Sequence, residues 1–541
     1  MSVTASSSSL AGGVERIDTS GKLVLPQLMQ RPTKKIVIVG GGTAGWLTAG
    51  VIAARHLSRM PGGFSVTLIE SPNTPIIGVG EGTWPTLRTT LAKIGVSETD
   101  FFRECDAAFK QGAKFARWTT GAHDDAYYHP LMLPQSFAQL NLAPHWLANG
   151  ESSFCDAVCP QGRICDDGLA PKTIATPEFE ALANYAYHLD AGKFAPFLQR
   201  HCTQKLGVRH VLADVQRVEM TEDGDIKSVV TEQAGEIEGD LFIDCTGFKA
   251  LLIGEALGVP FKDCSDVLFC DTALAVQLPY ESETSAIASH TISTAQSAGW
   301  IWDIGLPTRR GIGYVYSSDH TSGDDAEREL RTYLGAAGKD LPIRKIPIRS
   351  GHRETFWKRN CVAVGLAAGF LEPLEASAIV LIELSAKLIA EQMPACREVM
   401  DPIARRFNAT TDYRWGRIID FLKLHYVLTQ RRDSAFWQDN LRPESIPERL
   451  QELLLLWKYQ GPWFHDEFDR VEEVFPPASY QYVLYGMGFR TEVEHEALAG
   501  DAGLAARAMR ENAAQTQRLR AGLPRHRDLI RKIVDHGLQP V

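Results

Sequence analysis

The sequence predicts an α/β protein in which a parallel β-sheet is joined to a helix-rich C-terminal part. A βαβ unit near the N-terminus predicts the sheet. An apolar, β-branched strand at 35–39 is followed by a glycine-rich turn, a helix that includes Trp46, and a second strand at 65–70. The residues after about 400 are helix-rich, which predicts the C-terminal part.

Later segments add to both parts. Apolar runs at 240–244 and 360–365 predict two further strands, each of which ends in a glycine-containing turn. The stretch 376–393 is predicted to be helical, and so are the leucine-rich run 450–457 and the Ala/Arg-rich segment 502–521.

The composition is that of a globular protein and excludes several function classes. Of the 541 residues 44% are hydrophobic, which argues against a disordered chain. The 56 basic and 66 acidic residues give a net charge of -10, so the chain is not expected to bind nucleic acid. No apolar run approaches the roughly 20 residues that cross a bilayer, and no membrane association is expected.

The N-terminus and the cysteines indicate a cytoplasmic protein. Residues 1–32 are Ser-rich and lack the basic and apolar regions of a signal peptide, so we expect a flexible extension. Ten cysteines in a chain of this length suit a reducing compartment. The closest group, Cys155, Cys159 and Cys165, does not have the spacing of zinc or iron–sulfur ligands, and no metal site is predicted.

The glycine-rich turn after the first strand has the GxGxxG pattern of a Rossmann-type dinucleotide site. Its three glycines allow a tight turn, close approach of a pyrophosphate, and close packing of helix on strand. The helix N-terminus offers free N–H groups to the phosphates. Glu70, which closes the second strand, can accept a hydrogen bond from a ribose hydroxyl. The candidate residues of this turn are Gly40, Gly42, Thr43, Ala44 and Gly45.

The later glycine motifs favour FAD as the dinucleotide. Gly247 follows one distant strand, and Gly365 with Leu366 follows another, an arrangement that suits one extended cofactor. A second GxGxxG motif is absent from the sequence, so a dedicated NADPH domain is not expected.

From about residue 34 to 488 the chain resembles the flavin-dependent halogenases of the tryptophan halogenase family. The resemblance is carried by GGGTAGW at 40–46, GVGEGTWP at 78–85, AFK at 108–110, LFIDCTG at 241–247, GWIWDI at 299–304, FLEPLE at 370–375 and HY at 425–426. It departs from the family pattern at Gly305, where a proline is usual, and at 376–378, where Ala-Ser-Ala replaces Ser-Thr-Gly.

The resemblance implies a FAD-binding, flavin monooxygenase-like fold with an added helix-rich substrate domain. We expect a discontinuous FAD-binding domain at 33–395, with a substrate-side insertion at about 111–190, and a helical substrate-side domain at 396–541. The resemblance also implies that 78–85 is a strap beside the flavin, in which Gly78, Val79 and Gly80 permit close backbone approach.

The chemistry that the resemblance implies is halogenation of an aromatic ring. FADH2 arrives from a separate flavin reductase and, with O2 and chloride or bromide, yields hypohalous acid. Lys110 relays the halogen, either through a hydrogen bond to hypohalous acid or as a haloamine, and Glu375 assists as the acid–base partner. Ser377 and Ala378 lie where the family holds halide.

The substrate side is predicted from a few aromatic and apolar positions. Trp300 and Trp302 face the same side of a strand and are expected to separate the substrate from the flavin. His129, Leu131 and Phe475 match positions that line the family's aromatic pocket. The groups that grip an amino acid are not recognisable at 462–468, so an indole or another small electron-rich aromatic is expected rather than free tryptophan.

Two alternatives stay open from the sequence alone. One is a flavin-dependent monooxygenase that hydroxylates an aromatic, for which product formation would not depend on halide. The other is a catalytically silent flavoprotein that binds a partner through its helical part. The oligomeric state is also open, with a homodimer as one arrangement.

Overall fold

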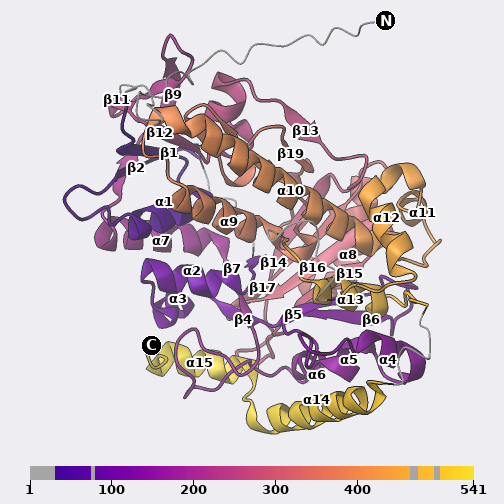
Figure 1. The fold of residues 1–541 in the computed structure, drawn as a ribbon. Helices are drawn as coiled ribbons and strands as arrows, with labels where there is room; N and C mark the ends of the chain where they lie inside the picture. Colours follow the sequence, from indigo (N-terminus) through magenta and orange to yellow (C-terminus); the bar gives the residue numbers. More distant parts are fainter. Residues whose placement is uncertain (1–30, 75–79, 464–472, 493–499, 541) are drawn as a thin grey trace, which may run out of the picture.

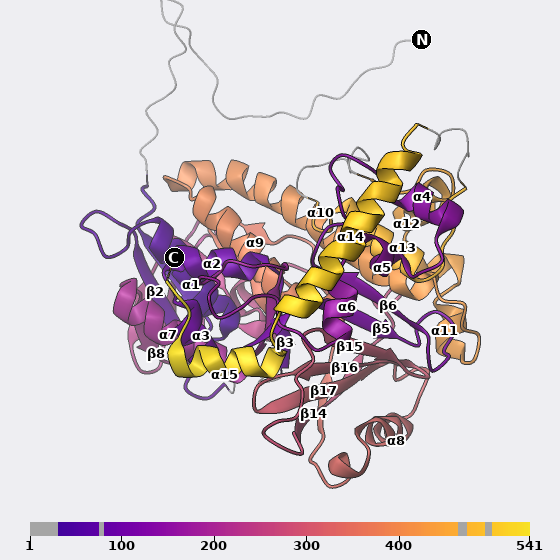
Figure 2. The same ribbon diagram turned by 90° about the horizontal axis from the view of Figure 1, so that it is seen from below.

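The computed structural model describes residues 31–74, 80–463, 473–492 and 500–540. Figure 1 shows a sheet-and-helix part that contains β1 and α1, a second sheet around β14 to β17, and the long helix α10 that runs between them. Figure 2 shows α14 and α15, near the C-terminus, crossing the lower face of both parts. Of the predicted extension 1–32, residues 1–30 lie outside the described residues.

The first sheet has six strands and carries the predicted βαβ unit. Its order is β20-β21-β12-β1-β2-β8, and all neighbours are parallel except β20 and β21. Residues 36–39 of β1 are buried because strands of a parallel sheet are covered on both faces. The strands are β1 (Lys35–Val39), β2 (Ser65–Glu70), β8 (Arg209–Leu212), β12 (Leu241–Asp244), β20 (Trp357–Lys358) and β21 (Cys361–Ala363).

Three helices pack around this sheet and against one another. The helix α1 contacts both α7 and α9, and α1 follows directly on the glycine turn. Their bounds are α1 (Thr43–Arg55), α7 (Ala191–Lys205) and α9 (Ser377–Glu391). The predicted Rossmann-type core is therefore confirmed.

The second sheet has seven strands in the order β18-β14-β17-β16-β15-β5-β6 and is mostly antiparallel. The exception is the parallel pair β15 and β5, which joins the early strands to the later meander. Its strands are β5 (Gly112–Ala116), β6 (Ala126–Pro130), β14 (Thr272–Pro279), β15 (Thr291–Ala295), β16 (Gly299–Gly305), β17 (Arg309–Tyr316) and β18 (Arg344–Pro347). The tryptophan pair lies on β16, as predicted.

A short three-stranded sheet connects segments that are far apart in sequence. Its order is β3-β7-β4, with β3 (Gly80–Gly82), β7 (Ala186–Asp190) and β4 (Ala108–Lys110). Gly82 and Ala108 both pair with His188 on β7. Directly paired residues share a face of a sheet, and so do residues two apart on a strand, so Gly82 and Lys110 lie on one face.

The C-terminal part is helical, as predicted, and returns to the rest of the molecule. The long helix α10 packs on β20 and α9, while α14 packs on α5 and α6, and α15 packs on α3. His526 of α15 accepts a hydrogen bond of 3.0 Å from the backbone N–H of Phe109, next to Lys110. The helices are α10 (Met400–Val427), α11 (Ala435–Asp439), α12 (Glu448–Trp457), α13 (Pro477–Gly486), α14 (Ala502–Gly522) and α15 (His526–His536).

The remaining elements cover the edges of these layers. The helices are α2 (Thr86–Ile94), α3 (Glu98–Glu104), α4 (Ala143–Asn149), α5 (Phe154–Val158), α6 (Gln161–Asp166) and α8 (Gly323–Leu334). The strands are β9 (Val215–Met220), β10 (Ile226–Thr231), β11 (Gly235–Glu238), β13 (Phe261–Asp263), β19 (Gly351–Arg353) and β22 (Gly369–Phe370). Within the described ranges, no helix is long and apolar enough to span a bilayer.

Candidate active site

The predicted cofactor residues gather at one edge of the six-stranded sheet. Strands β1, β12 and β21 run parallel and in register, so their carboxyl ends meet there. The turn that begins at Gly40 follows β1, Gly247 follows β12, and Gly365 follows β21. A side chain at Gly365 would come within 2.6 Å of Cβ of Ala44, which shows how closely the first and last motifs approach.

The turn at this edge is shaped to admit a pyrophosphate. Gly40 has a φ of 119°, and a side chain there would collide with the backbone carbonyl of Cys245. A side chain at Gly42 would meet nothing within 4 Å, so the start of α1 faces open space. Gly42 precedes α1 without a side-chain cap, which leaves the first helix N–H groups available to an anion. These residues fit FAD.

Glu70 closes β2 and is held beside the turn by a histidine. Nε2 of His210 lies 2.8 Å from a carboxylate oxygen of Glu70. The side-chain amide of Gln199 lies 3.1 Å from the other imidazole nitrogen, Nδ1. The amide N–H of Gln199 donates to Nδ1, and Nε2 lies close to the Glu70 carboxylate without the alignment of a hydrogen bond.

The predicted strap is only partly within the described residues. Gly78 and Val79 lie outside them, whereas Gly80 begins β3. Gly80 packs near Ile304 and Gly311 of the second sheet. Leu366 lies in a short 3-10 turn, Gly365–Ala367, at the cofactor edge.

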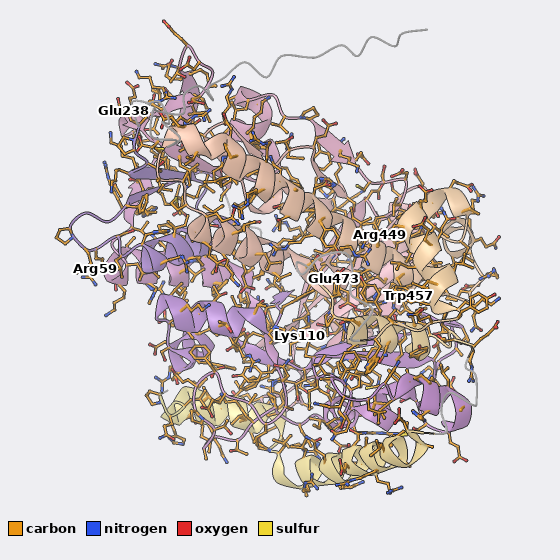
Figure 3. All side chains as sticks on the ribbon, in the orientation of Figure 1. Arg59, Lys110, Glu238, Arg449, Trp457 and Glu473 are labelled. Atoms are coloured by element: carbon orange, nitrogen blue, oxygen red, sulfur yellow. The ribbon has the colours of Figure 1, made fainter. Side chains whose placement is uncertain are left out.

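Lys110 is buried at the end of β4, with 4% of its surface exposed. Figure 3 shows it near the middle of the molecule. Its Nζ donates to the backbone carbonyl of Thr83 at 3.3 Å. Burial lowers the pKa of Lys110 to about 8, against the opposing effect of the Glu375 carboxylate. An amine with this pKa changes its protonation state close to neutral pH.

Gly82 leaves room for the Lys110 ammonium. A Cβ at Gly82 would lie 3.3 Å from Nζ of Lys110 and 3.3 Å from Cβ of Ala376. Glycine is therefore the residue that lets the strap, β4 and the loop after Glu375 converge.

Glu375 is buried between two histidines. Nδ1 of His129 lies 2.9 Å and 3.1 Å from the two carboxylate oxygens, and Nε2 of His425 lies 3.1 Å from Oε1. Burial by itself would raise the pKa of Glu375, but the two histidines outweigh it and hold the pKa well below its usual range. Glu375 is therefore a carboxylate, and it can accept a proton.

In each of these two histidines, the ring nitrogen that does not lie next to Glu375 also has a partner. Nε2 of His129 lies 2.8 Å from the hydroxyl of Ser479 on α13. Nδ1 of His425 lies 2.6 Å from the hydroxyl of Tyr127 on β6.

Aromatic rings, most of them from the C-terminal part of the chain, lie in the neighbourhood of Glu375. Phe475 is buried and stacks on Phe421 with ring centres 3.7 Å apart. The ring of Trp84 lies 4.8 Å from that of Phe475, tilted by 58°. Leu131 follows His129 by two residues and is half-buried, with its N–H bonded to Gln161. The structure thus brings His129 to Glu375 and Phe475 to His129, with ring centres 6.5 Å apart, and Leu131 is close by in sequence.

The predicted halide residues lie at the start of α9. Ala376 adopts a left-handed conformation with a φ of 55°, and the helix begins at Ser377. Ser377 is buried, whereas Ala378 is exposed. The turn directs the helix N-terminus, with its free N–H groups, next to Glu375.

The tryptophan pair packs as neighbouring rings whose centres are 6.4 Å apart. Trp300 is fully buried and packs against Trp118 at 6.5 Å, on the side of the sheet where His425 also lies. Trp302 is also buried and lies over Gly313 of β17. Whether the pair separates substrate from flavin stays a prediction.

Several site residues were not assigned a role from the sequence: Tyr127, Trp84, Phe421 and Ser479, and also His425, which served only as a motif position. Tyr127 could have been found from the period of two in β6, because it shares a face with His129. Ser479 and Phe421 carry no local signal. Among the described residues, no group of three or more acidic, histidine or cysteine side chains could hold a metal ion.

Known proteins resemble this chain along nearly its whole length. The family model described as tryptophan halogenase matches residues 35–502. The tryptophan 6-halogenase SttH of Streptomyces toxytricini is 35% identical over 480 residues, which is 85% of this chain and 90% of that protein. The crystal structure of a tryptophan halogenase from Shewanella frigidimarina has 48% identity and a TM-score of 0.92, covering 95% of this chain and 100% of that one.

A further solved structure is BrvH, a flavin-dependent halogenase from Brevundimonas sp. BAL3. It has 35% identity and a TM-score of 0.82, and the match covers 92% of this chain and 99% of that one. The family-model match includes both the glycine turn and the segments that hold Lys110 and Glu375.

Proposed function

This chain belongs to the tryptophan halogenase family of flavin-dependent enzymes, as its motifs predicted, and on that basis we propose that it halogenates an electron-rich aromatic such as an indole through Lys110 and Glu375. The observation that carries the proposal is the burial of an amine and a carboxylate in one electrostatically coupled site.

FAD fits the edge where the three glycine motifs meet, and as FADH2 from a separate reductase it would supply hypohalous acid from O2 and chloride or bromide. The N–H groups at the start of α1 bind the pyrophosphate, and Glu70 binds the ribose. The amides at Ser377 and Ala378, at the N-terminus of α9, attract the halide.

Lys110 positions and polarises the electrophile. Its ammonium donates a hydrogen bond to the oxygen of hypohalous acid, which makes the halogen more electrophilic at one point in space. The hydrogen bond to the Thr83 carbonyl fixes the direction of the side chain. The burial of the group excludes water that would otherwise compete for these hydrogen bonds.

Glu375 completes the substitution. As the aromatic carbon bonds to halogen, the oxygen–halogen bond of hypohalous acid breaks, and the oxygen leaves as water with a proton from the Lys110 ammonium. The C–H bond of that carbon then breaks and the electron pair returns to the ring. The proton forms an O–H bond on the Glu375 carboxylate. Before that step the same carboxylate stabilises the positive charge on the ring.

The aromatic substrate lies between His129, Leu131 and Phe475 in this proposal. The rings of Phe421 and Trp84 pack on Phe475 and make that wall rigid. An indole ring suits such a wall because aromatic groups pack favourably at ring separations of 4.5–7 Å.

The test supplies the purified protein with FAD, NADH, a generic flavin reductase and either chloride or bromide. The aromatic panel contains indole, a phenol and free tryptophan, and the products are identified by mass spectrometry. Halogenated product that requires halide is expected, and Lys110→Ala is expected to abolish it.

Two results would contradict the proposal. Halogenation retained by Lys110→Ala would remove the assigned role of Lys110. Hydroxylated product that forms without halide would identify a monooxygenase instead.

A further inference from the structure

His425 lies in an aromatic box that fixes the orientation of its ring. It is fully buried and stacks on Phe115 with ring centres 4.6 Å apart. Phe421 contacts it edge-on at 5.4 Å and Trp118 at 6.0 Å. With the ring held on three sides, each imidazole nitrogen faces one fixed neighbour.

The two neighbours of His425 have different hydrogen-bonding capacities. Nε2 lies 3.1 Å from Oε1 of Glu375, which as a carboxylate can only accept. Nδ1 lies 2.6 Å from the hydroxyl of Tyr127, which can donate its one hydrogen. The ring of Phe115 also stacks on Tyr127, at 4.8 Å and 8°, so this hydroxyl is fixed as well.

Burial assigns the protons within this chain of three groups. It lowers the pKa of His425, whose ring is therefore neutral and carries one N–H. Burial also raises the pKa of Tyr127, so the phenol keeps its hydrogen. Tyr127 donates to Nδ1, and the single imidazole hydrogen is on Nε2, which lies close to Glu375 without the alignment of a hydrogen bond.

His129 differs from His425 in the partner of its far nitrogen. Nε2 of His129 contacts the hydroxyl of Ser479 at 2.8 Å, and a serine hydroxyl rotates to donate or to accept. Ser479 therefore constrains the His129 ring less than Tyr127, whose ring is stacked on Phe115, constrains that of His425.

We propose that His425 is a positioning residue for Glu375, and that Tyr127 fixes its tautomer so that the ring hydrogen is kept on Nε2, beside the carboxylate. The proposal rests on the proposed role of Glu375 as the proton acceptor. Its consequence is that one N–H is held in a fixed place beside the Glu375 carboxylate.

The first test reads the tautomer in the resting protein and does not depend on activity. The protein is labelled with 15N-histidine, and the His425 signals are assigned by their loss in His425→Gln. The wild type should show an unprotonated Nδ1 and a protonated Nε2. Tyr127→Phe should shift the signals toward a mixture of tautomers. A protonated Nδ1 in the wild type, or no shift in the variant, would overturn the proposal.

The second test follows kcat against pH for Tyr127→Phe, with Tyr128→Phe as the matched control. Tyr128 is the next residue on β6, and its hydroxyl donates to Asp166 instead. In Tyr127→Phe kcat should fall about fivefold across the pH range, because the hydrogen on Nε2 beside the Glu375 carboxylate is no longer held there by the Tyr127 hydroxyl. KM for the aromatic should not change, and the profile of Tyr128→Phe should match that of the wild type.

A conservative variant separates positioning from simple structural loss. His425→Gln keeps an N–H donor and should keep more activity at pH 6 than His425→Leu, which has none. Equal loss in both variants, with an unchanged profile for Tyr127→Phe, would overturn the role of His425. If the wild type makes no halogenated product, the proposed function fails, and the tautomer measurement alone decides whether Tyr127 fixes His425.

Discussion

The indole N–H of Trp84 donates a hydrogen bond of 2.8 Å to the backbone carbonyl of Glu375. Trp84 follows β3 in the strap segment, while Glu375 ends the loop that precedes α9. The ring of Trp84 also packs on Phe475, which comes from the C-terminal part. One side chain therefore links the proposed flavin strap, the proposed base and the proposed substrate wall.

Replacing Trp84 should disturb catalysis more than stability. Trp84→Phe removes the N–H donor, and we expect a loss of about 1–2 kcal/mol in the free energy of unfolding together with a lower kcat. Trp357→Phe is the control, because it removes a similar indole bond, to the carbonyl of Arg359, far from the site. Urea unfolding and kcat are measured for both, and equal kcat values would contradict the linking role of Trp84.

The pH dependence of the rate should report the charge of Lys110. If the ammonium polarises the hypohalous acid, kcat should fall as the pH rises through about 8, where Lys110 loses its proton. A haloamine route needs the free amine and would give a rate that rises over the same range. Lys110→Arg, which stays charged, should lose this basic limb. The measurement is kcat from pH 6 to 10 at saturating aromatic and halide.

Gly82→Ala should displace the Lys110 ammonium. The added methyl would lie 3.3 Å from Nζ and 3.3 Å from Cβ of Ala376, so one of the three groups has to move. A shift of about 1 Å in a reacting group can cost on the order of a hundredfold in rate, and we expect at least a tenfold loss of kcat. Gly416→Ala, where a methyl meets nothing within 4 Å, should leave kcat unchanged.

FAD affinity should depend on His210. His210→Ala removes the close contact beside the Glu70 carboxylate, and we expect FAD to bind about fivefold more weakly, as for the loss of one partly exposed charge contact of about 1 kcal/mol. Quenching of flavin fluorescence measures this without turnover. The control is His201→Ala. This change removes a hydrogen bond between the His201 side chain on α7 and the backbone carbonyl of Ile94 on α2. Unchanged FAD affinity in His210→Ala would show that Glu70 does not need this partner.

Local patterns were sufficient for the cofactor edge. The strand at 35–39, its glycine turn and Glu70 lie within one βαβ unit, so backbone preferences and burial determine their arrangement. Gly247 and Gly365 could be added because each directly follows an apolar strand, and parallel strands place such turns at one edge. The predicted division at 395 and 396 remains a prediction, since α10 packs on both β20 and α9.

The surroundings of Glu375 depend on the tertiary structure. Residues 129 and 375 are 246 positions apart, and residues 127 and 425 are 298 apart, so no local period relates them. They meet because β6, the loop before α9 and the long helix α10 pack around one point.

The sequence by itself determined the fold class, the family resemblance, and Lys110 and Glu375 as candidates, because short motifs carry that information. Only the tertiary structure decided which groups face Glu375, that Trp84 holds its backbone, and that Tyr127 stands behind His425. The physical reason is that local sequence sets backbone conformation and the buried face of each element, whereas hydrogen bonds between distant residues exist only after those faces have packed.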